Sequence, residues 1–156
     1  MRTNRYLAAL FAIALAISLA SCTGASRYHG YDVAAQWYEI NHKAMEDRYA
    51  TATPEDQAWM RKNVNPYMNI YKHTLRGIHA TEKGDEVKFA DASNMIVEYG
   101  TLLAGYHVEY DVAPVIKALR MLRAGDTGAY DILGEELLKI KDIIMKAFDI
   151  HVWGGE

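Results

Sequence analysis

Apolar residues recur every three or four positions along most of the chain, which is the pattern of helices that bury one face. The period predicts helical segments at residues 31–50, 53–84, 85–106, 112–125 and 128–150. The last segment is the most regular, with Leu133, Leu137, Ile140 and Ile144 on one stripe. The alternation of period two that marks strands is missing from the sequence.

Two breaks leave the exact number of helices open. Pro66 interrupts the segment 53–84, and either the helix kinks there or Asn65 caps a new helix with Pro66 at its first position. We expect a kinked continuous helix, because the apolar stripe keeps its phase across the break. Asp111 and Pro114 mark the second break, where two helices or one bent helix remain equally compatible with the sequence.

Four long helical runs joined by short turns favour antiparallel neighbours. The sequence therefore predicts an all-α, up-down four-helix-bundle-like domain with one kinked or broken helix. Nothing marks a repeat or a second domain, so residues 28–156 are expected to form a single domain.

The first 22 residues have the pattern of an export signal. Arg2 and Arg5 precede an uncharged apolar run from Tyr6 to Ala20, which is short for a transmembrane helix, and an uncleaved transmembrane anchor is the alternative. The run ends in Leu-Ala-Ser-Cys at residues 19–22, which resembles the lipobox of bacterial lipoproteins. That resemblance implies cleavage of a signal peptide, residues 1–21, a thioether-linked diacylglycerol on Cys22, and a further acyl chain such as palmitate on its new amino group.

The resemblance also predicts where the mature protein resides. Two or more acyl chains anchor durably, whereas one chain anchors only marginally. Residues 22–27 then form the acylated cysteine and a short tether, which holds the domain against the bilayer. Thr23 stands where the inner-membrane retention signal of enteric bacteria has Asp, so by analogy we expect the outer membrane, facing the periplasm, in a cell with two membranes.

Charge and cysteine content exclude some function classes. Without the signal, 15 basic residues face 20 acidic ones, and the formal net charge is −5 with neutral histidines. A basic surface for nucleic acid or anionic lipid is therefore not expected, and membrane contact falls to the acylated Cys22. Because Cys22 is the only cysteine, the folded part has no disulfide.

A metal- or haem-binding helical bundle is the alternative function. Carboxylate-bridged di-metal sites in bundles use Glu-x-x-His, a spacing that Glu39 and His42 share. They are a weak pair of candidates, because no other histidine has this spacing, and we favour the alternative that they lie on a solvated helix face. Noncovalent haem between a Met and a His stays open. We expect neither a metal nor another cofactor.

A second polar cluster lies at residues 105–111, where His107, Glu109 and Asp111 alternate with other residues. Such a cluster can bind a cation or work as an acid and base. We favour the structural interpretation, in which Asp111 caps the following helix and the other two side chains are exposed.

Catalytic motifs are missing, since the sequence has no Gly-x-Ser-x-Gly and no phosphate-binding loop. We therefore expect a non-enzymatic, lipid-anchored binding or scaffolding domain, with an envelope protein as a candidate partner. Tyr28 and Tyr31 precede the first apolar stripe, and aromatic rings with a polar tip suit wet apolar interfaces. Both are predicted to contact the bilayer or a partner.

Overall fold

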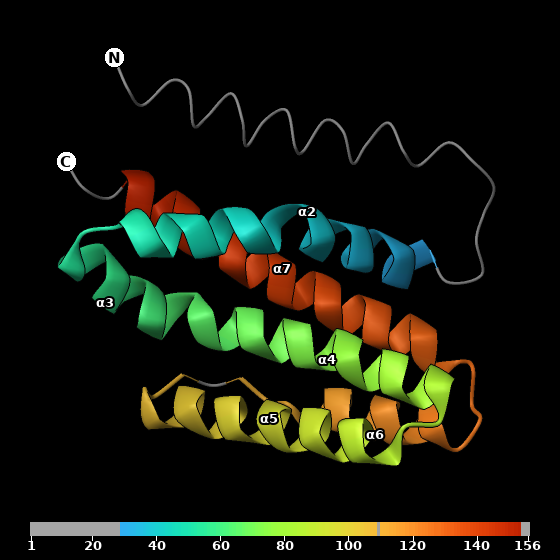
Figure 1. Cartoon of the computed structure of the whole chain (residues 1–156). Coiled ribbons are helices and arrows are strands. Elements are labelled where there is room, and N and C mark those ends of the chain that lie inside the picture. The colour runs from blue at the N-terminus through green and yellow to red at the C-terminus, as the bar shows by residue number, and fades with distance from the viewer. Residues whose placement is uncertain (1–28, 109, 154–156) are drawn as a thin grey trace.

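The computed structural model describes residues 29–108 and 110–153, and these form helices and no strand (Figure 1). The helices are α2 (His29–Thr51), α3 (Pro54–Asn63), α4 (Asn65–Lys83), α5 (Glu86–Gly105), α6 (Ala113–Arg123) and α7 (Ala129–Trp153). The predicted all-α bundle-like fold is confirmed. No helix within the two described ranges combines the length and the apolar character that crossing a bilayer requires.

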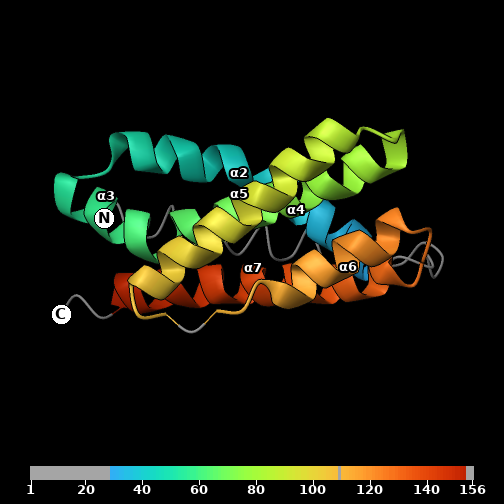
Figure 2. The same cartoon turned by 90° about the horizontal axis from the view of Figure 1, so that it is seen from below.

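Helices α4 and α7 lie at the centre of the bundle. Helix α4 packs against α2, α5, α6 and α7, and α7 packs also against α2 and α6. Figure 1 shows that α4 runs opposite to α2, α5 and α7, and Figure 2 shows α5 crossing obliquely while α6, which runs opposite to α5 and α7, lies beside α7. The start of α2, the end of α4 and the start of α7 meet at one end of the molecule.

Every helix contributes to one continuous apolar core. The regular stripe of the last predicted segment is confirmed, because Leu133, Leu137, Ile140 and Ile144 of α7 are all 0% exposed. Burying one such side chain contributes about 1.5–3 kcal/mol to folding. The domain is held together by this core, since the described ion pairs lie mainly at exposed side chains.

The segment around Pro66 forms two helices that meet at Val64, and not the single kinked helix that we expected. Proline has no N–H for the carbonyl four residues earlier, and its ring clashes with that carbonyl. Pro66 therefore lies in the first turn of α4, where no donor is required. Val64, and not Asn65, occupies the cap position, and no side chain caps the helix. The apolar stripe nevertheless keeps its phase, because Val64 is fully buried.

Helices α5 and α6 are separate, which settles the second break. Helix α5 ends in a Schellman motif, in which the Val108 N–H donates to the Leu103 carbonyl at 3.1 Å and the His107 N–H donates to the Ala104 carbonyl at 2.9 Å. His107 takes the left-handed conformation that this motif requires, with φ 59°. Glycine normally occupies that position, as Gly84 does after α4 with φ 66°.

Replacing His107 with glycine is expected to raise the free energy of unfolding by about 1 kcal/mol, because a side chain in the left-handed region costs about 1–2 kcal/mol. Urea denaturation followed by circular dichroism measures the change. Gly84→Ala is the matched opposite, and it should lower stability by a similar amount although a Cβ there has no atom within 4 Å. Loss of stability in His107→Gly would contradict the assignment of strain to this residue.

Helices α2 and α7 cross in direct backbone contact. A Cβ on Gly134 would lie 2.6 Å from the Tyr31 nitrogen and 2.8 Å from the Gly30 carbonyl carbon. Real Cβ atoms do not approach backbone so closely, so only glycine at position 134 permits this crossing.

Candidate functional site

Of the residues that the sequence proposes as functional, Cys22 and Tyr28 lie outside the described residues, and so does Glu109. The predictions of lipidation at Cys22 and of a contact at Tyr28 therefore stay predictions. Helix α2 begins at His29, seven positions after Cys22.

Tyr31 lies at the end of the bundle where α2 begins. Its ring packs against the Tyr130 ring of α7 with 5.4 Å between centroids, and the Tyr130 hydroxyl donates to Glu82 Oε1 of α4 at 2.7 Å. Burial, followed by the nearby carboxylates of Glu82 and Asp32, raises the pKa of Tyr31. Tyr31 is thus half-buried against Tyr130, which in turn contacts α4, so only the outer part of Tyr31 is open to a bilayer or a partner.

Glu39 and His42 do not form part of a metal-ligand cluster in the described structure. Glu39 is exposed, and His42 is half-buried with its ring stacked on Tyr38 at 4.9 Å. The His42 Nδ1 donates to the Tyr38 carbonyl at 3.0 Å, which leaves one ring nitrogen for other contacts. Among residues 29–108 and 110–153 no three His, Cys, Asp or Glu side chains gather closely enough to hold a metal ion. The geometry gives the metal alternative no support.

The polar cluster at residues 105–111 is spread over a turn. His107 is exposed, and the Asp111 carboxylate accepts a hydrogen bond from the Ala113 N–H at 2.8 Å. The prediction that Asp111 caps the following helix is confirmed in this sense, although Val112 occupies the cap position itself. The Asp111 carboxylate thus stabilises the first turn of α6.

The buried polar side chains are used for packing. His73 of α4 stacks on Tyr99 of α5 at 6.2 Å, and burial, followed by Arg76 and Lys72, lowers the pKa of His73. Its ring is therefore neutral at pH 7. Glu136 is 8% exposed and accepts a hydrogen bond from Lys139 at 2.6 Å. Among the described residues, neither the His73 ring nor the Glu136 carboxylate hydrogen-bonds to a hydroxyl group.

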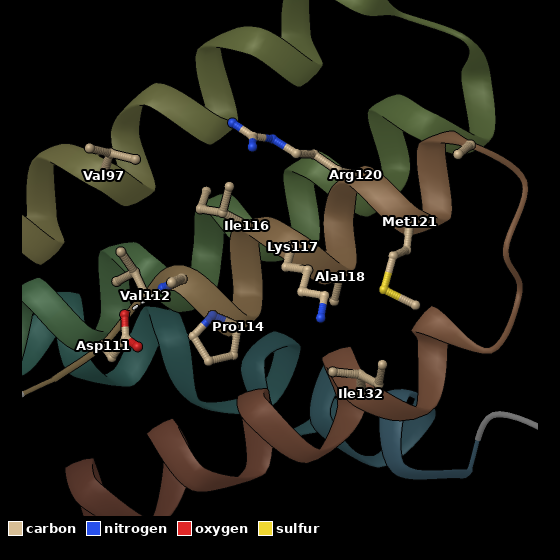
Figure 3. A pocket seen from close by; sticks show the side chains of 12 residues that line it. Val97, Asp111, Val112, Pro114, Ile116, Lys117, Ala118, Arg120, Met121 and Ile132 are labelled. Atoms are coloured by element: carbon tan, nitrogen blue, oxygen red, sulfur yellow. Dashed lines mark hydrogen bonds between the residues drawn. The ribbon is translucent and has the colours of Figure 1, made fainter.

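Sequence reasoning missed one feature, an open apolar groove on the outer side of α6 (Figure 3). It has a volume of about 1140 Å³ and lies between α5, the segment that precedes α6, and the start of α7. Its apolar lining comes chiefly from Val97, Val112, Pro114, Ile116, Met121 and Ile132. Only a weak sequence pattern indicates the groove, because Val97 and Ile132 are apolar but fall outside the core stripes. In the structure their side chains are 50% and 37% exposed.

The floor of the groove is fixed by buried contacts beneath it. Leu119 of α6 is fully buried against Gly77 of α4, where a Cβ would lie only 3.1 Å from the leucine side chain. A Cβ on Gly100 of α5 would lie 2.9 Å from the Val112 side chain, so this glycine likewise leaves room for its neighbour. Because glycines allow these close approaches, α6 packs tightly against α4, and Val112 packs tightly against α5.

Two cations accompany the apolar lining. Figure 3 shows Arg120 extending from α6 toward α5 and Val97, whereas Lys117 extends toward α7 and Ile132. The cationic side chains thus lie on both sides of Ile116. An apolar strip between cations is able to bind an amphipathic, negatively charged ligand.

No protein-family model, curated protein or solved structure matches this chain.

Proposed function

We propose that this chain is a lipid-anchored, non-enzymatic α-helical domain that binds or scaffolds a partner at the periplasmic face of a bacterial membrane, the outer membrane in a cell that has two. One observation carries the proposal: Leu-Ala-Ser-Cys at residues 19–22 closes an uncharged run of signal-peptide length. Cys22 is the only cysteine, so it has no partner for a disulfide within the chain. Acylation at a lipobox gives it a function.

The position of α2, the first helix within the described residues, supports attachment close to the bilayer. Helix α2 begins at His29, so residues 23–28 separate it from Cys22. Six residues span at most about 20 Å when fully extended. The end of the bundle that contains Tyr31, Tyr130 and Glu82 would then face the lipid headgroups. Tyrosine rings with polar tips suit such a zone.

The groove supports the binding part of the proposal. Exposed apolar side chains gathered in a concave surface mark interaction sites more often than scattered ones do. The groove is lined by apolar side chains, two cations and the Asp111 carboxylate and includes no serine, threonine, cysteine or histidine, so it is suited to binding rather than to chemistry. A surface of this kind on an anchored domain is expected to hold a second component at the membrane.

Cys22→Ala is expected to abolish lipid attachment and transfer to the outer membrane, because the acyl chains have no other attachment site in this proposal and the uncleaved signal segment holds the precursor in the inner membrane. The Cys22→Ala precursor should keep its signal segment. The unaltered chain should also accumulate with its signal segment when cells are treated with globomycin, since that antibiotic blocks the lipoprotein signal peptidase. Membrane fractionation with immunoblotting measures the change, and separation of inner from outer membranes reads the location.

Ser21→Ala is the control for this experiment, because it keeps a small residue before the cysteine. It should be processed and anchored like the unaltered chain. Unchanged processing and unchanged fractionation of Cys22→Ala would refute the anchor.

A further inference from the structure

We propose that the groove along α6 binds an acidic amphipathic helix of a partner protein. The apolar face of that helix would lie against Ile116, Met121 and Ile132, and its carboxylates would lie beside Lys117 and Arg120. This inference rests on the proposed binding function, and it adds the surface and the chemistry of the partner.

Charge is the first argument for an acidic partner. The chain as a whole is acidic, with a formal net charge of −3, whereas the groove is lined by two cations, Lys117 and Arg120, and by one carboxylate, Asp111, which accepts a hydrogen bond from the Ala113 N–H. Neither cation forms an ion pair with any residue that the structure describes. Arg123, in the next turn of α6, does have a partner and donates to Glu86 of α5 at 3.2 Å. Within the described residues the two groove cations thus have no carboxylate partner, which leaves them to carboxylates from outside this part of the chain.

The placement of the two cations is the second argument. Arg120 lies on the α5 side of Ile116 and Lys117 on the α7 side (Figure 3). A helix that lies along the groove presents apolar residues at positions i, i+3, i+4 and i+7, and the positions beside that stripe lie over the two cations. Helix α6 has 11 residues, about 16 Å, which matches three turns of such a partner.

The open form of the groove favours a helix over a lipid chain. A site for a small apolar ligand encloses most of the ligand surface, because each exposed CH₂ loses its favourable transfer from water. A helix needs to bury only one face and keeps its polar face in water. The groove is open along its outer side, where Val97 is 50% exposed, so it suits an occupant with one apolar face.

Site-specific photo-crosslinking in the full chain tests the inference. A benzophenone amino acid replaces Val97 or Ile132, which line the groove, or Val87 as the control, which is 72% exposed and lies outside it. The chain is expressed in its own host, irradiated in intact membranes, and the crosslinked peptide is identified by mass spectrometry. We expect crosslinks from positions 97 and 132, and not from 87, to one peptide with an apolar 3–4 period flanked by Asp or Glu.

Charge reversal gives the second arm. Lys117→Glu with Arg120→Glu is expected to lower the crosslink yield at position 132 at least about tenfold, through repulsion of the acidic flanks. Lys43→Glu with Lys146→Glu makes the same change of charge at exposed positions outside the groove, and it should leave the yield unchanged. Circular dichroism melts of both double variants check that the fold persists.

Four results would overturn the inference: a crosslink to lipid, a crosslink to a second copy of this chain, a crosslinked peptide without acidic flanks, and a yield at positions 97 and 132 no higher than at 87. Chemical crosslinking over the whole surface separates this inference from the proposed function. If it returns a partner bound elsewhere, the binding function stands and the groove assignment fails. If it returns none, both fail.

Discussion

Gly134→Ala is expected to destabilise the domain by about 3 kcal/mol, the upper part of the range for overpacking a core. The added Cβ would lie 2.6 Å from the Tyr31 nitrogen and 2.8 Å from the Gly30 carbonyl carbon, so α2 must move away from α7 as a whole. A side chain in the way can rotate, but helix backbone cannot. Urea denaturation followed by circular dichroism measures the change in the free energy of unfolding.

Gly30→Ala is the matched control across the same contact. Its Cβ would lie 3.8 Å from the Gly134 backbone, which is an ordinary van der Waals distance. Alanine also favours the helix relative to glycine, so stability should stay the same or rise slightly. Equal effects of the two substitutions would contradict the crossing of α2 and α7 described above.

Tyr71→Ala is expected to cost about 3–5 kcal/mol, as the removal of a large buried aromatic ring does. Tyr71 is 0% exposed, and its ring contacts Trp37 at 5.3 Å and Tyr38 at 5.6 Å between centroids. Its hydroxyl donates to the Ala34 carbonyl at 2.6 Å, and burial raises its pKa. The substitution would therefore leave a cavity between α4 and α2. The same denaturation experiment measures the loss in the free energy of unfolding.

Tyr71→Phe separates the ring from the hydroxyl. It keeps the stacking and loses one buried hydrogen bond, so it should cost about 1 kcal/mol. A loss of less than about 1 kcal/mol in Tyr71→Ala would mean that this aromatic cluster is not part of the core.

The helices were predictable from the sequence because burial imposes a period of 3.6 residues. Residues 31–50 and 128–150 were expected to be helical, and α2 and α7 span 29–51 and 129–153. The break at Val64 was not predicted, because the apolar stripe continues in phase through it and conceals the effect of Pro66 two residues later.

The contacts between helices were harder to predict, because they depend on which faces meet. Gly134 lies inside a regular helical pattern, and nothing in the sequence indicates that Gly30 lies opposite it. The groove was missed for a related reason. Val97 and Ile132 interrupt polar faces of two different helices, and they form one surface only after α5 and α7 are placed on either side of α6.

The polar residues show the opposite limitation. The spacing of Glu39 and His42 indicates one half of a metal site, but spacing on one helix cannot show whether other helices supply ligands. Asp111 was correctly assigned to the start of a helix, because that interaction is local and needs no knowledge of the packing.

The intact mass of the protein, extracted from its own membranes with detergent, tests the anchor most directly. The account predicts a chain that begins at Cys22, lacks residues 1–21, and carries the added mass of a diacylglycerol and a further acyl chain. A chain that keeps Met1, or one that begins near residue 22 with an unmodified thiol, would contradict it.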